Sequence, residues 1–148
     1  VLAAAVSFAV LWGDFRWANT QRYAAAKFVE QSAGYERTYF YKGHWGFQWY
    51  MYQHGFPAYD SLGSEVFLGD RIVYPSNNPA PGEFNPYVAR AIDGMNVDIP
   101  STFGVTTMHR DVGAGFYTHF LGPLPFVFGP VPAETYWVMQ IGDFREME

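Results

Sequence analysis

The chain opens with thirteen residues that carry no charge, residues 1–13 (VLAAAVSFAVLWG), and the cluster Asp14-Phe15-Arg16-Trp17 follows directly. A helix of thirteen residues at about 1.5 Å each covers about two-thirds of the roughly 30 Å hydrocarbon core of a bilayer. We interpret the run as the end of a truncated membrane span. Trp12, Arg16 and Trp17 would then lie at the membrane interface, where aromatic and basic residues gather.

Three other interpretations of this apolar run stay open: a buried core helix, the apolar part of a signal peptide, and an interfacial anchor. A signal peptide has the weakest support, because no basic region precedes the run and no small-x-small cleavage pattern follows it.

Residues 14–32 are rich in alanine and straight-chain side chains, which favour helix. Trp17, Gln21, Ala24 and Phe28 recur on one face, so the segment is predicted to be an amphipathic helix. Only Gly13 separates it from the apolar run, which predicts one continuous rod. Gly34 is suited to end that rod, because glycine tolerates the left-handed conformation that follows many helices.

The next pattern is strand, glycine turn and helix. Residues 38–41 (TYFY) are β-branched or aromatic, residues 42–46 (KGHWG) form a tight turn, and residues 47–55 are predicted to be a short helix. Further strands are expected at residues 56–59 and 71–74. This order is typical of a βαβ unit, which places its two strands in parallel.

Five prolines divide residues 75–100, so an irregular excursion is expected there, with helical character only at residues 87–92. Residues 103–108 and 135–141 are the last two predicted strands. The fold class is therefore α/β, a small sheet of about five strands with flanking helices, mounted on an N-terminal membrane-anchoring helix. Two parts are expected: a membrane-proximal anchor and stem helix at residues 1–33, and an α/β extracytoplasmic domain at residues 34–148.

Composition narrows the classes of function. Charged residues make up 16% of the 148 residues and aromatic residues 20%. Because about 25% charge is usual, part of the surface is expected to be covered by lipid or by a partner subunit. A net charge of -5 without a basic cluster argues against nucleic acid. The absence of cysteine excludes disulfides and thiolate chemistry.

Candidate chemistry is sparse. Gly43, His44, Trp45 and Gly46 lie where open α/β folds bind ligands, between a strand and the start of a helix. The turn lacks the G-x-G-x-x-G and P-loop patterns, so a tight turn with Trp45 packing inward explains it better than phosphate binding. His109-Arg110-Asp111 is explained as well by a solvated turn as by acid–base or metal chemistry. No catalytic residue, metal site or cofactor is assigned.

Four segments together resemble a known family: residues 39–52 (YFYKGHWGFQWYMY), 69–75 (GDRIVYP), 113–129 (GAGFYTHFLGPLPFVFG) and 131–141 (VPAETYWVMQI). The chain resembles the C-terminal extracytoplasmic domain of bacterial polytopic membrane glycosyltransferases. These enzymes form the GT-C superfamily, with the protein mannosyltransferases and the aminoarabinose transferases. The resemblance implies a polyprenyl-phosphate-linked sugar as donor. It also implies a catalytic carboxylate in a loop between membrane helices, which no residue of this sequence matches.

The resemblance implies a non-catalytic, membrane-anchored domain on the periplasmic side, a lid or acceptor-side domain of such a transferase. The expected partners are membrane lipid and either membrane subunits or a membrane half of the same protein. An alternative is an accessory or scaffold subunit of a larger membrane complex, without activity of its own. A third class is a soluble module for sugar or lipid phosphate, using the turn at Gly43–Gly46 and the aromatic residues 116–128.

Overall fold

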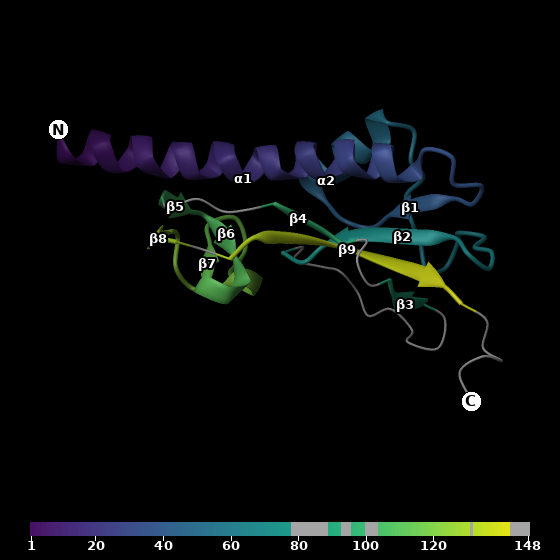
Figure 1. Ribbon diagram of the computed structural model, residues 1–148. Coiled ribbons are helices and arrows are strands. Elements are labelled where there is room, and N and C mark those ends of the chain that lie inside the picture. Colours follow the sequence, from purple (N-terminus) through teal and green to yellow (C-terminus); the bar gives the residue numbers. More distant parts are fainter. Residues whose placement is uncertain (78–88, 93–95, 100–103, 131, 143–148) are drawn as a thin grey trace.

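The computed structural model of the protein describes residues 1–77, 89–92, 96–99, 104–130 and 132–142. It is a mixed α/β structure in which two helices cover one face of a sheet, and two small sheets lie beside the N-terminal half of the long helix (Figure 1). The elements are α1 (Leu2–Ser32), β1 (Tyr39–Tyr41), α2 (Trp45–Gln53), β2 (Arg71–Pro75), β3 (Ala89–Ala91), β4 (Val97–Ile99), β5 (Gly104–Thr106), β6 (Met108–His109), η1 (Arg110–Val112), β7 (Ala114–Gly115), η2 (His119–Leu121), β8 (Val127–Gly129) and β9 (Glu134–Ile141).

Helix α1 confirms the predicted continuous rod, because its 31 residues run through Gly13 without a break. Its C-terminal half buries most of the predicted face, namely Gln21, Ala24 and Phe28. None of the residues before Gly13 is buried, and this end projects beyond the sheet (Figure 1). Gly34, just past the helix, has the expected positive φ of 78°. Across the described residues, neither helix combines the length and the apolar character needed to cross a bilayer.

The main sheet has five strands in the order β1-β2-β9-β3, with β4 also paired to β9. β1 and β2 are parallel, as the βαβ pattern predicted, with Phe40 opposite Ile72. β9 is antiparallel to β2, and it carries β3 and β4 along its other edge. β9 is therefore the centre of the sheet, and it orders strands that are distant in the sequence.

The alternation of side chains along these strands gives the sheet two apolar faces. Phe47 and Met51 of α2, with Phe28 of α1, pack on the face that carries Tyr136 and Val138. The opposite face buries a smaller cluster made of Phe40, Ile72, Ala89 and Ile141. The helices therefore cover only one side, and the larger core lies beneath them.

Three sequence predictions about strands need correction. Residues 89–91 form strand β3 and not a helix, because their backbone pairs with β9 and this overrides the helical propensity of alanine and arginine. Residues 87–88 of that predicted helix lie outside the described residues, as does most of the expected irregular excursion. Residues 56–59 form no strand and contribute a single bridge between Ala58 and Tyr41.

The predicted strand at residues 103–108 is also different in the structure. It divides into β5 and β6, which pair with β8 and β7 in two separate two-stranded sheets. Residue 103 lies outside the described residues. β7 and β8 lie between the last two predicted strands, at residues expected to form a loop. They are the partners of β6 and β5. The expected number of strands in the main sheet is right, but β3 and β4 occupy places given to residues 56–59 and 103–108.

Candidate functional site

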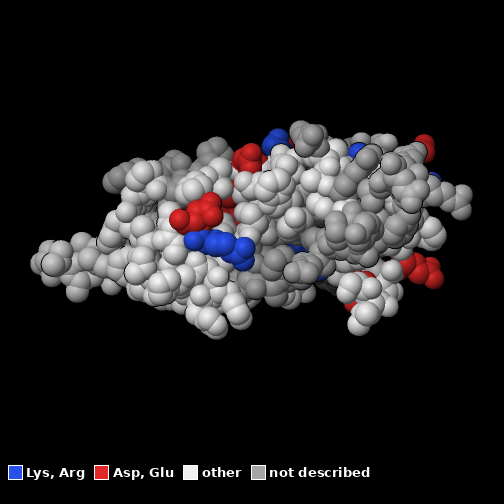
Figure 2. Space-filling model, turned by 90° about the horizontal axis from the view of Figure 1, so that it is seen from below, with Lys and Arg blue, Asp and Glu red and all other residues white. Residues whose placement is uncertain are grey.

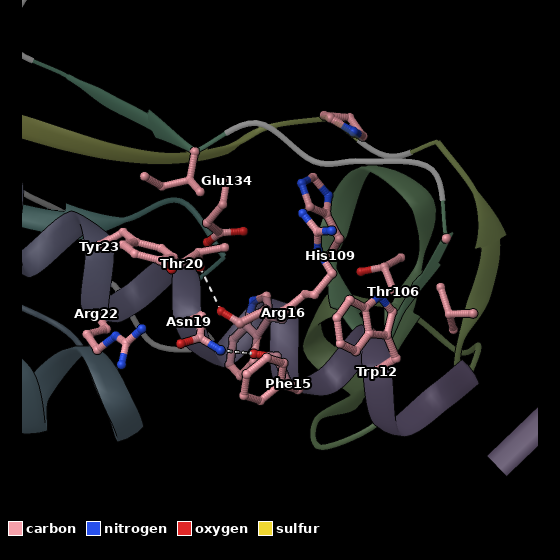
Figure 3. A pocket seen from close by; sticks show the side chains of 16 residues that line it. Trp12, Phe15, Arg16, Asn19, Thr20, Arg22, Tyr23, Thr106, His109 and Glu134 are labelled. Atoms are coloured by element: carbon pink, nitrogen blue, oxygen red, sulfur yellow. Dashed lines mark hydrogen bonds between the residues drawn. The ribbon is translucent and has the colours of Figure 1, made fainter. Parts of the chain in front are cut away.

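A cavity of about 290 Å³ lies between α1 and the segment that carries β4, β5 and β6. Its outer rim comes from α1, where Trp12, Phe15, Arg16 and Tyr23 are all exposed. Figure 3 shows these side chains along one side of the helix, with Arg16 extending in the direction of His109. Two of the residues predicted to lie at a membrane interface, Trp12 and Arg16, therefore form the mouth of a cavity.

The inner wall of the cavity is polar and buried, and it contains Thr106, His109 and Glu134. Glu134 is the first residue of β9, where its side chain is in phase with the buried Tyr136 and Val138. Its Oε2 accepts a hydrogen bond of 2.5 Å from Asn77 Nδ2. Burial nevertheless raises the pKa of Glu134 to about 7, because desolvation outweighs the stabilising contacts from Asn77.

His109 is 5% exposed, and its two ring nitrogens differ in their partners. Nδ1 accepts a hydrogen bond of 3.3 Å from the backbone N–H of Asp111, so the neutral ring carries its proton on Nε2. Nε2 is buried and has no hydrogen-bond partner among the described residues. Burial lowers the pKa of His109, and the Asp111 carboxylate and the Ala133 carbonyl partly oppose this shift. The ring is therefore buried and neutral.

Trp17 also has a buried ring nitrogen, and this indole Nε1 makes no hydrogen bond within the described part of the chain. The neighbouring polar groups are already used. The Thr20 hydroxyl donates to the Trp17 carbonyl at 2.7 Å, so the Tyr136 hydroxyl, 2.9 Å away, donates to Thr20. Because Tyr136 is fully buried, its pKa lies well above the usual value.

The turn predicted as a ligand site lies elsewhere, between β1 and the start of α2. Trp45 has a positive φ of 58° and packs edge-to-face on Trp17, with ring centroids 6.1 Å apart. A Cβ on Gly46 would come within 2.3 Å of Gln21 Oε1, so glycine permits the close approach of α1 and α2. His44 precedes α2 and is exposed, and Gly43 has a φ of 158°. The contacts of this turn are those of helix packing.

The structure brings together only part of the predicted site residues. Trp17 contacts the turn through Trp45 and lines the cavity, whereas the turn itself does not line it. Sequence reasoning missed Glu134 as a site residue, although its place in the alternation of β9 marked it as an inward carboxyl. Within the described ranges, no three His, Asp or Glu side chains come together as a metal site would require.

Comparison with protein-family models, with curated proteins and with solved structures finds no match to this chain. The functional argument therefore depends on the residues and their geometry.

Proposed function

We propose that this chain is a non-catalytic, membrane-seated extracytoplasmic domain of glycosyltransferase ancestry. In this role it covers the membrane cavity of a polyprenyl-phosphate-sugar-dependent transferase, or holds the acceptor there. The residues that catalyse transfer belong to membrane segments of the same polypeptide or to a partner subunit. The observation that carries the membrane assignment is the charge-free, exposed end of α1.

This end is apolar in every direction around the helix. Before Asp14 there is no charged residue, and Leu2, Phe8 and Leu11 are all strongly exposed although they point to different sides. A helix that docks on a protein needs one apolar stripe, whereas a helix surrounded by hydrocarbon is apolar all round. Figure 2 shows no blue or red atoms at the end from which α1 projects. Lipid is therefore the environment that this segment fits.

A second charge-free segment lies beside it. Residues 112–133 contain no Asp, Glu, Lys or Arg, and Phe116, Phe120 and Phe128 in this stretch are exposed. Asp14 connects the two segments, because it accepts hydrogen bonds from Tyr117 Oη at 2.8 Å and from Thr107 Oγ1 at 3.0 Å. Aromatic side chains are favoured at the membrane interface. This loop supports a domain that rests on the bilayer surface as well as being anchored in it.

The membrane assignment is tested by flotation of the purified chain with phosphatidylcholine vesicles. Phe8→Asp places a charge on the projecting segment about 6 Å before Trp12 along the helix axis. It is expected to weaken vesicle binding at least tenfold, because an inserted Asp costs about 2.5–3.5 kcal/mol at the centre of a span and part of this cost applies at that depth. Leu62→Asp is the matched control, since Leu62 is 97% exposed but lies outside α1. Equal binding of the two variants, or no flotation of the wild type, would overturn the assignment.

An accessory or scaffold subunit is the second candidate, and the outer face of α2 favours it. Trp49 and Tyr52 are exposed there, although the helix lies away from the projecting end of α1 (Figure 1). Aromatic residues of this kind are enriched at protein interfaces. The two roles are separated by deleting the domain genetically in the source cells and then assaying the isolated membranes. Loss of sugar transfer from polyprenyl phosphate supports the transferase role, whereas unchanged transfer with loss of a stoichiometric complex supports the scaffold.

A further inference from the structure

The cavity beside α1 runs along the helix. Trp12 and Tyr23 both line it and are eleven positions apart, which is about 16 Å along the helix axis. Figure 3 shows Glu134 at the Tyr23 end of the cavity, with its side chain extending from β9 toward α1. Ile99 of β4 pairs directly opposite Glu134, so the two side chains share one face of the sheet. A buried carboxyl therefore lies between an aliphatic side chain and an aromatic ring.

The size of the cavity limits what it can hold. An apolar cavity of about 150 Å³ accommodates benzene. The volume of about 290 Å³ therefore has room for about twice as much, or about ten to twelve non-hydrogen atoms. The Tyr23 ring is 54% exposed and Ile99 is partly buried, so apolar surface is open to such a molecule. These dimensions fit one small molecule of two fused rings.

Most polar side chains that line the cavity are already bonded to the protein. The Asn19 side chain donates to a backbone carbonyl of its own helix at 2.8 Å, and the Thr20 hydroxyl lies 2.9 Å from that of Tyr136. His109 Nδ1 accepts from the Asp111 backbone at 3.3 Å. A ligand with many polar atoms would leave some of them without partners, at a cost of about 1–3 kcal/mol each. The cavity therefore favours a ligand with few polar atoms.

Glu134 is the polar group best placed to meet a ligand. A carboxyl group has about four acceptor sites, and the contacts from Asn77 use only part of them. Burial raises the pKa of Glu134 to about 7, so the ionised and protonated forms both occur near neutral pH. A hydroxyl group can donate to the first form and accept from the second. It is therefore the polar group that suits both forms.

The charges around the cavity exclude charged ligands. Arg16 and Arg22 line it and are exposed, so they repel a cation as it enters. The Glu134 carboxyl, which is 5% exposed, opposes a negative charge at the inner wall. An uncharged molecule avoids both costs.

We propose that this cavity binds a small, uncharged aromatic alcohol, with its rings between Tyr23 and Ile99 and its hydroxyl group hydrogen-bonded to Glu134. The proposal goes beyond the membrane role, because it concerns the cavity alone and requires no bilayer. A glycan fits less well, since most of its hydroxyl groups would have no free partner among the polar side chains described above.

The proposal is tested by NMR of isoleucine δ1-methyl groups, with the whole chain in a non-ionic detergent. The probe is 2-naphthol at about pH 6, where a phenol-type hydroxyl is uncharged. We expect a saturable shift of the Ile99 methyl and intermolecular NOEs from the naphthol rings to it. The methyl groups of Ile72 and Ile141 lie in the cluster on the opposite face of the sheet and should not change. Ile99→Val assigns the resonance.

Naphthalene, which lacks the hydroxyl group, isolates the role of Glu134. Glu134→Leu is expected to weaken 2-naphthol binding about tenfold and to change naphthalene binding by less than about threefold. Continued binding of naphthalene shows that the cavity persists in the variant. Glu134→Gln keeps an acceptor and should keep the preference for the hydroxyl group. Glu30→Leu is the matched control, because it removes an exposed carboxylate of α1 outside the cavity.

Charged analogues test the exclusion of ions. 2-Naphthoate and 2-naphthylmethylammonium are each expected to bind at least tenfold more weakly than 2-naphthol, and methyl glucoside should give no shift at the same concentrations. Four results would overturn the proposal: no saturable Ile99 shift with 2-naphthol, equal binding of either ion, tighter binding of methyl glucoside, or an unchanged hydroxyl preference in Glu134→Leu. None of them affects the flotation assay, so the membrane role stands or falls separately.

Discussion

The two halves of α1 share one backbone but differ in what surrounds them. From Asp14 onward the helix has one buried face, on which Ala24 and Phe28 pack against the sheet and α2. Before Gly13 it has no buried residue and no charge. The C-terminal half packs on the main sheet and α2, whereas the half before Gly13 lies beside the small sheets and is at most partly buried. The comparison teaches that the apolar residues of one helix build the core in one half and stay largely exposed in the other.

The largest expected change in stability comes from replacing phenylalanine by alanine in the C-terminal half of α1, compared with the same replacement in the N-terminal half. Phe28 is 0% exposed and packs edge-to-face on Phe47, whereas Phe8 is 76% exposed. Phe28→Ala is expected to lower the free energy of unfolding by about 3–5 kcal/mol. Phe8→Ala is expected to change it by less than about 0.5 kcal/mol and to weaken vesicle flotation instead. Urea unfolding in non-ionic detergent measures the first quantity. Equal losses of stability would show that both halves pack alike.

A change of pH is expected to change stability through Glu134, which lies on β9 and lines the cavity beside α1. The pKa of Glu134 is raised from 4.5 to about 7 by folding, so its contribution to stability is complete below about pH 4.5 and is lost as the pH rises through 7. A shift of this size corresponds to about 3 kcal/mol between the two limits. Glu134→Gln removes the titration and should unfold at a higher urea concentration than the wild type at pH 8.

The titration of His109 changes stability with pH in the opposite direction. The Glu134→Gln variant separates the contributions of the two residues. Its pKa is lowered, so it contributes stability above its ordinary value that is lost as the pH falls and the ring is protonated. Both proteins contain His109, so its contribution cancels when the stability of Glu134→Gln is compared with that of the wild type at each pH. A difference that stays constant from pH 4.5 to 8 would contradict the assignment to Glu134. Vesicle flotation of the wild type should not follow this titration.

The smallest expected effect lies at Gly13, where the two halves meet. A Cβ at this position would come within 2.2 Å of the Val105 carbonyl oxygen on β5. Gly13→Ala gains about 1 kcal/mol of helix propensity, but the clash forces β5 away at a cost of about 1–3 kcal/mol. We expect a net loss of about 1 kcal/mol in urea unfolding. Ala18→Gly at an exposed helix position measures the propensity alone, and a more stable Gly13→Ala would show that β5 moves freely.

The local features of the fold could be predicted from the sequence. The spacing of Gln21, Ala24 and Phe28 gave the buried face of α1, and the aromatic run at residues 39–41 gave β1. Strand β3 could not be predicted in this way, because its residues favour helix and only pairing with β9 makes them extended. Tertiary context commonly overrides a weak local preference.

The cavity was beyond sequence reasoning for a related reason. Its wall joins Trp12 and Arg16 to His109 and Glu134, which are more than ninety positions away in the chain. No local spacing connects such residues. The turn at Gly43–Gly46 shows the converse, since its local pattern resembled a ligand site while its contacts are those of packing against α1.

The unbroken backbone of α1 through Gly13 also has a mechanical consequence. A rigid helix of 31 residues is about 46 Å long, so a tilt of about 10° at one end displaces the other by about 8 Å. On the proposed membrane seating, the helix would act as a lever. A change in bilayer thickness that tilted residues 1–13 would then move the sheet sideways over the membrane surface.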